Sequence, residues 1–143
     1  MQSFWDWLRG GSKAFYASEL LVVHYIARNL PEKDAEVLKV QVRTLRLVQR
    51  PSKQMTLCFY PKGCSTPVFE SPNNEACLAM VKLSSKAKRK RTVKLMVHHG
   101  RLHRIEGEVP SDLTEAQLSE LQLWPSTFGK SVADALDRLE HGK

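Results

Sequence analysis

The chain has 143 residues, of which 42% are hydrophobic and 26% are charged, and a formal net charge of +7 at pH 7. These values are typical of a soluble globular protein and suffice for one core, so we expect a single domain over residues 1–143. No apolar run reaches the roughly 20 residues that a membrane helix needs. The first residues also lack the regions of a secretory signal. We therefore expect no membrane partner.

The residues that commonly carry chemistry show no catalytic or zinc-binding pattern. Cys58, Cys64 and Cys77 are odd in number and lack the CxxC spacing of a zinc site. The GxSxG, HExxH, P-loop and dinucleotide-binding motifs are missing as well. We therefore expect reduced thiols, a cytoplasmic location, no metal and no other cofactor, and we favour a protein that is not an enzyme.

Charge is unevenly divided along the chain. Residues 51–105 carry eleven Lys and Arg against two Asp and Glu, a net charge of +9. Residues 1–50 carry +3, and residues 106–143 carry −5. This asymmetry indicates either an anionic partner or an acidic tail that lies beside a basic sheet.

The N-terminal part of the chain predicts helices. A short turn around Trp5 and Trp7 ends at Gly10-Gly11, because adjacent glycines disfavour a helix. Residues 12–29 then form an amphipathic helix, whose single apolar stripe is Tyr16, Leu20, Val23, Ala27 and Leu30. His24 lies beside this stripe, and we expect a structural role for it.

A second helix is predicted from Pro31, because acidic residues follow where the helix dipole favours them. It changes to a strand between residues 42 and 45. Residues 45–50 and 55–60 alternate as a hairpin around residues 51–53. The following loop, residues 61–76, contains three prolines, with room for one short strand at Val68-Phe69.

Residues 77–109 predict a three-stranded antiparallel meander at the centre of the fold. The apolar residues alternate at period two, which is typical of strands with one buried face. In the first strand the expected buried face is Cys77, Ala79, Val81 and Leu83, and in the second it is Val93, Leu95 and Val97. The loop between these strands carries Lys86, Lys88, Arg89, Lys90 and Arg91.

The second and third strands of the meander can pair in two registers, which differ in the length of the turn around Gly100. A two-residue turn would put His98 and His103 on one face, but it would set the apolar residues of the second strand opposite charged ones. A three-residue turn aligns the apolar residues of the second strand with His103 and Ile105 on the buried face. It also pairs Lys94 with Glu106. We favour the three-residue turn, which makes His98 and His103 face opposite ways and predicts no metal site there.

The chain beyond Val109 predicts two further helices. Thr114 and Gln117 have the spacing of a capping box, so a short helix is expected from there through Leu121 until Pro125 breaks the pattern. A last amphipathic helix spans residues 128–139, with its apolar stripe at Phe128, Val132, Ala135 or Leu136, and Leu139.

This element order predicts the α+β class: an antiparallel sheet of five or six strands with N- and C-terminal helices packed on one face. A strongly curved sheet wrapped around the helices, as in cystatin-like or NTF2-like cones, fits the same order and implies nothing about function. We expect the other face to be open and basic, with Arg46, Arg50, Lys82, Lys94 and Arg104 among its residues.

The basic loop is the best candidate for a binding site. The expected partner-binding or anion-binding residues are Lys86, Lys88, Arg89, Lys90, Arg91 and Lys94. Phosphates could organise such a loop, but no aromatic residue lies between Phe69 and Trp124 to stack on bases. We therefore favour a small non-catalytic adaptor, inhibitor or immunity-type protein that recognises an acidic protein partner.

Two alternatives remain open. The first is a nucleic-acid-binding protein that uses the same loop. The second is a small enzyme with a pocket beneath residues 61–76. Separately, Glu106 and Glu108, two apart on a strand, could act as an acid–base pair. We favour a role for these two carboxylates in balancing the charge of the basic strand beside them.

Overall fold

The structure is a computed structural model that describes residues 15–70, 75–84 and 91–123. The turn predicted around Trp5 and Trp7 and the helix predicted over residues 128–139 lie outside these ranges. The described elements are α2 (Ala17–Arg28), α3 (Glu32–Thr44), β1 (Leu47–Ser52), β2 (Met55–Phe59), β3 (Glu75–Leu83), β4 (Arg91–His98), β5 (Arg101–Glu106), a 3₁₀ turn (Glu115–Gln117) and β6 (Leu118–Leu123). The predicted α+β class is confirmed.

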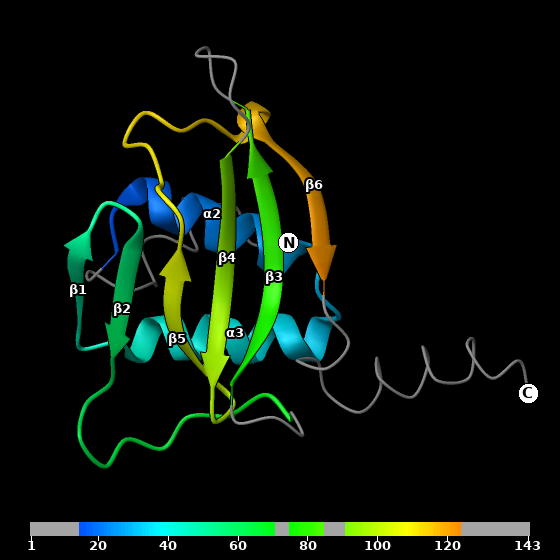
Figure 1. Ribbon diagram of the computed structural model, residues 1–143. Coiled ribbons are helices and arrows are strands. Elements are labelled where there is room, and N and C mark those ends of the chain that lie inside the picture. Colours follow the sequence, from blue (N-terminus) through cyan, green and yellow to red (C-terminus); the bar gives the residue numbers. More distant parts are fainter. Residues whose placement is uncertain (1–14, 71–74, 85–90, 124–143) are drawn as a thin grey trace, which may run out of the picture.

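The described residues form one six-stranded antiparallel sheet in the order β1-β2-β5-β4-β3-β6. Both described helices lie on the same face of this sheet (Figure 1). Helix α2 contacts β3 and β6, and α3 contacts β5. No described helix covers the other face, which we call the open face. The cone-like alternative stays a prediction.

The two helices form where periodicity and end signals predict them. The first turn of α2 is closed by Glu19, whose carboxylate accepts a hydrogen bond from the Tyr16 backbone amide at 2.7 Å. Helix α3 starts directly after Pro31 and carries acidic residues in its first turn. It ends at Thr44, two residues beyond the predicted boundary.

The core lies between the helices and the sheet. Burying these side chains is the main favourable contribution to folding, at about 25 cal/mol per Å² of apolar surface. The fully buried members include Leu20, Val22, Val23, Ile26, Leu38 and Val42 from the helices, and Leu78, Ala79, Val81, Val93, Leu95, Leu102 and Ile105 from the sheet.

Strand β3 contains a bulge that alternation did not predict. The register with β4 shifts between Cys77 and Ala79, so Leu78 and Ala79 both face the core. Cys77 is therefore only half-buried, and its predicted place on the buried face is wrong. An extra residue shifts the alternation, so the side chains beyond it point to the opposite face of the sheet from the one expected.

The segment after Val109 gives a second correction. The predicted capping box is present, with the Thr114 amide donating to the Gln117 side chain at 2.8 Å, but it starts only a 3₁₀ turn. Residues 118–123 then form β6 and pair with β3 instead of continuing as a helix. Pairing satisfies backbone groups along the edge of β3 that a short helix would leave without strand partners.

The loop after β2 is extended but contains no strand at Val68-Phe69, contrary to prediction. Phe69 is buried, and its amide donates to the Gly100 carbonyl at 2.9 Å. Gln41, which is fully buried on α3, donates to the carbonyls of Pro67 and Gly100 and accepts from the Leu102 amide. These contacts attach the loop to α3 and to the β4–β5 turn.

Candidate functional site

Four of the six predicted binding residues, Lys86, Lys88, Arg89 and Lys90, lie outside the described ranges. The segment that contains them joins the ends of two paired strands, because Leu83 at the end of β3 is the register partner of Arg91 at the start of β4. Residues 85–90 contain no Asp or Glu. The loop therefore carries four positive charges without an acidic residue of its own.

The other two predicted residues lie on β4 with acidic residues beside them. The Arg91 Nη1 atom donates to the Glu108 carboxylate at 2.9 Å, and the Arg91 side chain is 42% exposed. Lys94 is exposed and is the register partner of Glu106, as the sequence predicted. Arg91 and Lys94 therefore lie on the strand that directly follows the basic loop in the sequence.

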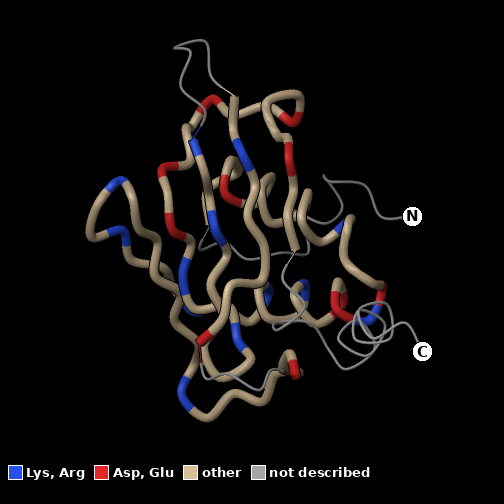
Figure 2. Tube along the Cα trace, turned by 45° about the vertical axis from the view of Figure 1, so that its right-hand side comes forward, with Lys and Arg blue, Asp and Glu red and all other residues tan. Residues whose placement is uncertain are grey.

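Ion pairs balance most of the charge on the described open face. The Arg104 guanidinium bonds Glu106 at 2.6 Å and also Glu75, and Lys82 pairs with Glu120 at 3.0 Å. Burial alone would lower the pKa of Arg104, but its hydrogen bonds to Glu75 and Glu106 raise it. Figure 2 shows basic and acidic positions alternating over the strands. The ion pairs therefore make the open face less basic than the sequence predicted.

Apolar side chains also lie on the open face. Thr56 and Cys58 of β2 are buried toward the helices, so Met55, Leu57 and Phe59 alternate onto the other side. Phe59 is 41% exposed. Partly exposed Met80 and Met96, on β3 and β4, extend the apolar surface. The meander itself has no aromatic residue, as the sequence shows, and Phe59 comes from β2 outside it.

The turn between β4 and β5 combines both registers considered from the sequence. His99 (φ 50°) and Gly100 (φ 79°) form a two-residue turn with His98 opposite Arg101, and left-handed backbone at both positions is the type I′ hairpin geometry. The register then shifts so that Met96 pairs with Arg104, which leaves His103 as an extra, bulged residue.

The two-residue turn sets His98 and His103 on one face, where their rings lie close together. The ring centroids of His98 and His103 are 5.3 Å apart, and those of His98 and His99 are 4.1 Å apart. The prediction that His98 and His103 face opposite ways is therefore wrong. Burial lowers the pKa of His103, and the charge of Arg104 adds to this effect.

A cavity of about 240 Å³ adjoins the three imidazoles and is also lined by Cys58, Tyr60, Arg101 and Leu102. Burial, together with the negative charge of Glu19, raises the pKa of Cys58 to about 12. A thiol with so high a pKa is protonated near neutral pH and is a poor nucleophile. The proximity of Cys58 to the histidines therefore gives no support to Cys-His catalysis.

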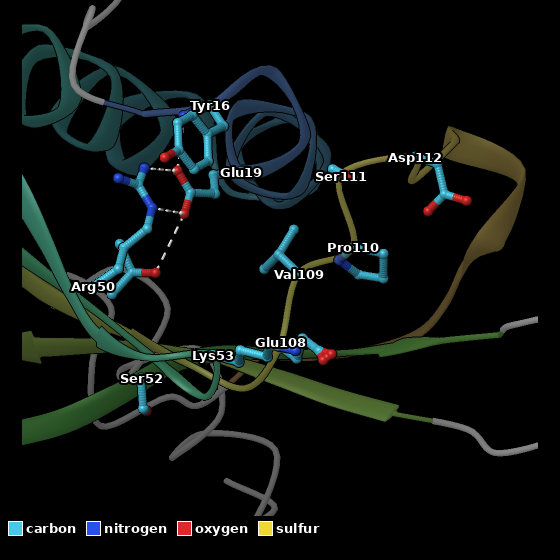
Figure 3. A pocket seen from close by; sticks show the side chains of 11 residues that line it. Tyr16, Glu19, Arg50, Ser52, Lys53, Glu108, Val109, Pro110, Ser111 and Asp112 are labelled. Atoms are coloured by element: carbon cyan, nitrogen blue, oxygen red, sulfur yellow. Dashed lines mark hydrogen bonds and ion pairs between the residues drawn. The ribbon is translucent and has the colours of Figure 1, made fainter.

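A second cavity, of about 640 Å³, lies where the N-terminus of α2 faces the β1–β2 turn and residues 108–112 (Figure 3). Glu19 is 4% exposed in its wall and accepts hydrogen bonds from the Nε and Nη2 atoms of Arg50. The Thr56 hydroxyl donates to Glu19 at 3.2 Å. The Tyr16 ring covers the guanidinium, with 3.7 Å from the Arg50 Cζ atom to the ring centroid.

Arg50 is consequently not on the open face, as the sequence had predicted. Val48 packs against the core, and Arg50, two residues further along β1, faces the same side. The hydrogen bond to Glu19 raises the pKa of Arg50. No sequence signal joined Glu19 to Arg50, because they are 31 positions apart and only the packing of α2 on the sheet brings them together.

The rest of the cavity wall has mixed charge, because it contains Lys53, Glu108 and Asp112 together with Ser52 and Ser111. It is not the pocket predicted beneath residues 61–76, since neither of the two cavities is lined by residues of that loop. Phe69 in its described part is buried, and the buried Gln41 side chain bonds the loop at Pro67.

Comparisons with protein-family models, with curated proteins and with solved structures gave no match. Among the residues that the structure describes, no helix has the length and apolar character needed to span a bilayer. Within the same ranges, no three His, Cys, Asp or Glu side chains are grouped so as to hold a metal ion.

Proposed function

We propose that the chain is a small non-catalytic binding protein that recognises an acidic surface of another protein through residues 86–91 and the adjoining open face. The observation that carries this proposal is the make-up of the open face. It presents Leu57, Phe59 and Met96 beside an Arg104 that two carboxylates hold in place. Protein interfaces are enriched in aromatic residues, Met and Arg, so this face has a suitable composition for a protein partner.

The charge distribution supports an acidic partner. On the described sheet, Lys82, Arg91 and Arg104 have carboxylates of their own chain as partners. Residues 86–90 hold four further positive charges of this stretch, with no acidic residue among them. Charges at the rim of an interface mainly raise the association rate and the specificity. In this proposal the loop attracts the partner and the apolar part of the face holds it.

The same features favour protein over nucleic acid. Single-strand binders place aromatic side chains along the basic track that follows the phosphates. Here Phe59 lies on β2, where it is paired with Leu47 of β1. Arg91 is the first residue of β4 and directly follows the basic loop. The exposed aromatic residue and the cations therefore do not form one track. The cytoplasmic location predicted from the cysteines is part of this proposal.

The experiment that tests this proposal is affinity capture from a host extract, with and without nuclease, followed by direct binding of the purified partner. The bait is the full chain, compared with the charge-reversed variant K88E/R89E/K90E. We expect an acidic protein whose capture resists nuclease and whose direct binding is lost with the variant. A steep salt dependence of binding to a labelled oligonucleotide, or capture that nuclease abolishes, would instead support nucleic acid and overturn the proposal.

A further inference from the structure

The imidazoles beside the β4–β5 turn have the separation of two ligands on one metal ion. A tetrahedral ion with metal–nitrogen distances of about 2.0–2.1 Å holds two imidazole centroids about 5 Å apart. The centroids of His98 and His103 are 5.3 Å apart, with their planes inclined by 42°. The two-residue turn at His99-Gly100 places both residues on one face, whereas a register of three turn residues would separate the two rings.

The backbone that carries these ligands is fixed by contacts away from the imidazoles. Gln41 bonds the Gly100 carbonyl at 2.8 Å and the Leu102 amide at 2.9 Å, so both the turn and the residue before His103 are attached to α3. Ligands on a rigid backbone lose little conformational freedom when an ion binds. The adjoining cavity gives space for water ligands.

The nearby positive charges are engaged elsewhere. Arg101 lies over the Tyr60 ring and donates to the Cys64 carbonyl at 3.0 Å. Arg104 is bonded to Glu75 and Glu106. Glu75 is also the register partner of His98, so a carboxylate lies beside the imidazole pair. Carboxylates commonly support metal-binding histidines from outside the first shell of ligands.

We propose that His98 and His103 form a two-imidazole site for a divalent transition ion, Cu²⁺, Ni²⁺ or Zn²⁺, whose remaining ligands are water. Imidazole suits these ions, and the general order of affinity places Cu²⁺ first. This site does not depend on the proposed protein partner, and it binds the ion in the chain alone.

The test is calorimetric titration of the full chain with Cu²⁺ and with Zn²⁺. We expect one ion per chain and a dissociation constant that rises at least about tenfold in H98Q and in H103Q, since each removes one of two protein ligands. His141→Gln is the matched control for imidazole binding elsewhere and should leave the constant within about twofold. Equal binding by the wild type and the double variant H98Q/H103Q would overturn the proposal.

A second measurement uses the unmodified chain, in case a variant fails to fold. Long-range nitrogen NMR spectra of the imidazoles, recorded with increasing Zn²⁺, should show saturable shifts for His98 and His103 and none for the buried His24. Shifts spread equally over all histidines, or none at these two residues, would contradict a specific site.

Discussion

The buried side chain of Gln41 bonds the carbonyl of Gly100 at 2.8 Å, which joins the middle of α3 to the tip of the β4–β5 hairpin. The same amide group also bonds Pro67 and Leu102. Its nitrogen donates twice and its oxygen accepts once at one place, where the helix, the hairpin and the loop after β2 meet.

Replacing Gln41 by Leu should destabilise the fold by about 2–4 kcal/mol, because buried carbonyl and amide groups would be left without partners. Urea unfolding measures the change. Gln49→Leu on exposed β1 is the matched control and should change the free energy of unfolding by less than about 0.5 kcal/mol. A Gln41→Leu variant as stable as the control would contradict the role given to this side chain.

Gly100 and Gly63 form a matched pair for testing the turn. Both have left-handed backbone, with φ of 79° and 76°. A Cβ atom on Gly100 would lie 2.6 Å from the Phe69 carbonyl oxygen, whereas one on Gly63 would meet nothing within 4 Å. Gly63→Ala should therefore cost about 1 kcal/mol, the left-handed penalty alone, and Gly100→Ala about 3 kcal/mol. Thermal unfolding showing equal losses would argue against the close approach of the loop.

Removing only one partner of the Glu19–Arg50 pair should destabilise the fold more than removing both. Arg50→Met leaves the nearly fully buried carboxylate of Glu19 without its main partner, so we expect a loss of about 3 kcal/mol. The double variant E19M/R50M should recover much of that loss, because no buried charge remains. Chemical denaturation of the two single variants and the double variant measures the coupling. Additive losses would show that the pair is not energetically linked.

Stability should fall as the pH drops below about 6.5, in part because of His24. Burial lowers the pKa of His24, the charge of Arg28 lowers it further, and Glu115 opposes them. The unfolded chain then takes up a proton at a higher pH than the folded chain does, so the stability present above the unfolded pKa is lost on acidification. His24→Gln should reduce the difference in urea midpoint between about pH 7.5 and about pH 5.5. The same substitution at the exposed His99 should leave this difference in urea midpoint unchanged.

Local periodicity predicted the helices and the core residues of β4, because it depends only on neighbouring residues. It could not predict where a strand takes an extra residue. Leu78 and His103 are such residues, and each changes which side chains share a face. The facing of Cys77 follows from the first bulge, and the proximity of His98 to His103 follows from the two-residue turn before the second.

The remaining errors arise from contacts between distant segments. Leu118 to Leu123 has a helix-starting signal before it, but pairing with β3 determines its structure. Glu19 and Arg50 meet only after α2 packs on the sheet. For the basic loop, four of the residues chosen from the sequence lie outside the described ranges, so their role stays a prediction.

The most direct test of the proposed function is the affinity of the captured acidic partner for two triple charge reversals of the chain. K88E/R89E/K90E reverses the basic loop. K33E/K39E/R43E makes the same change in charge on α3, which packs on the opposite face of the sheet (Figure 1). We predict binding about tenfold or more weaker for the first variant and within about twofold of wild type for the second, with both unfolding at the wild-type temperature. Equal affinities for the two variants would contradict the proposal that the loop recognises the partner.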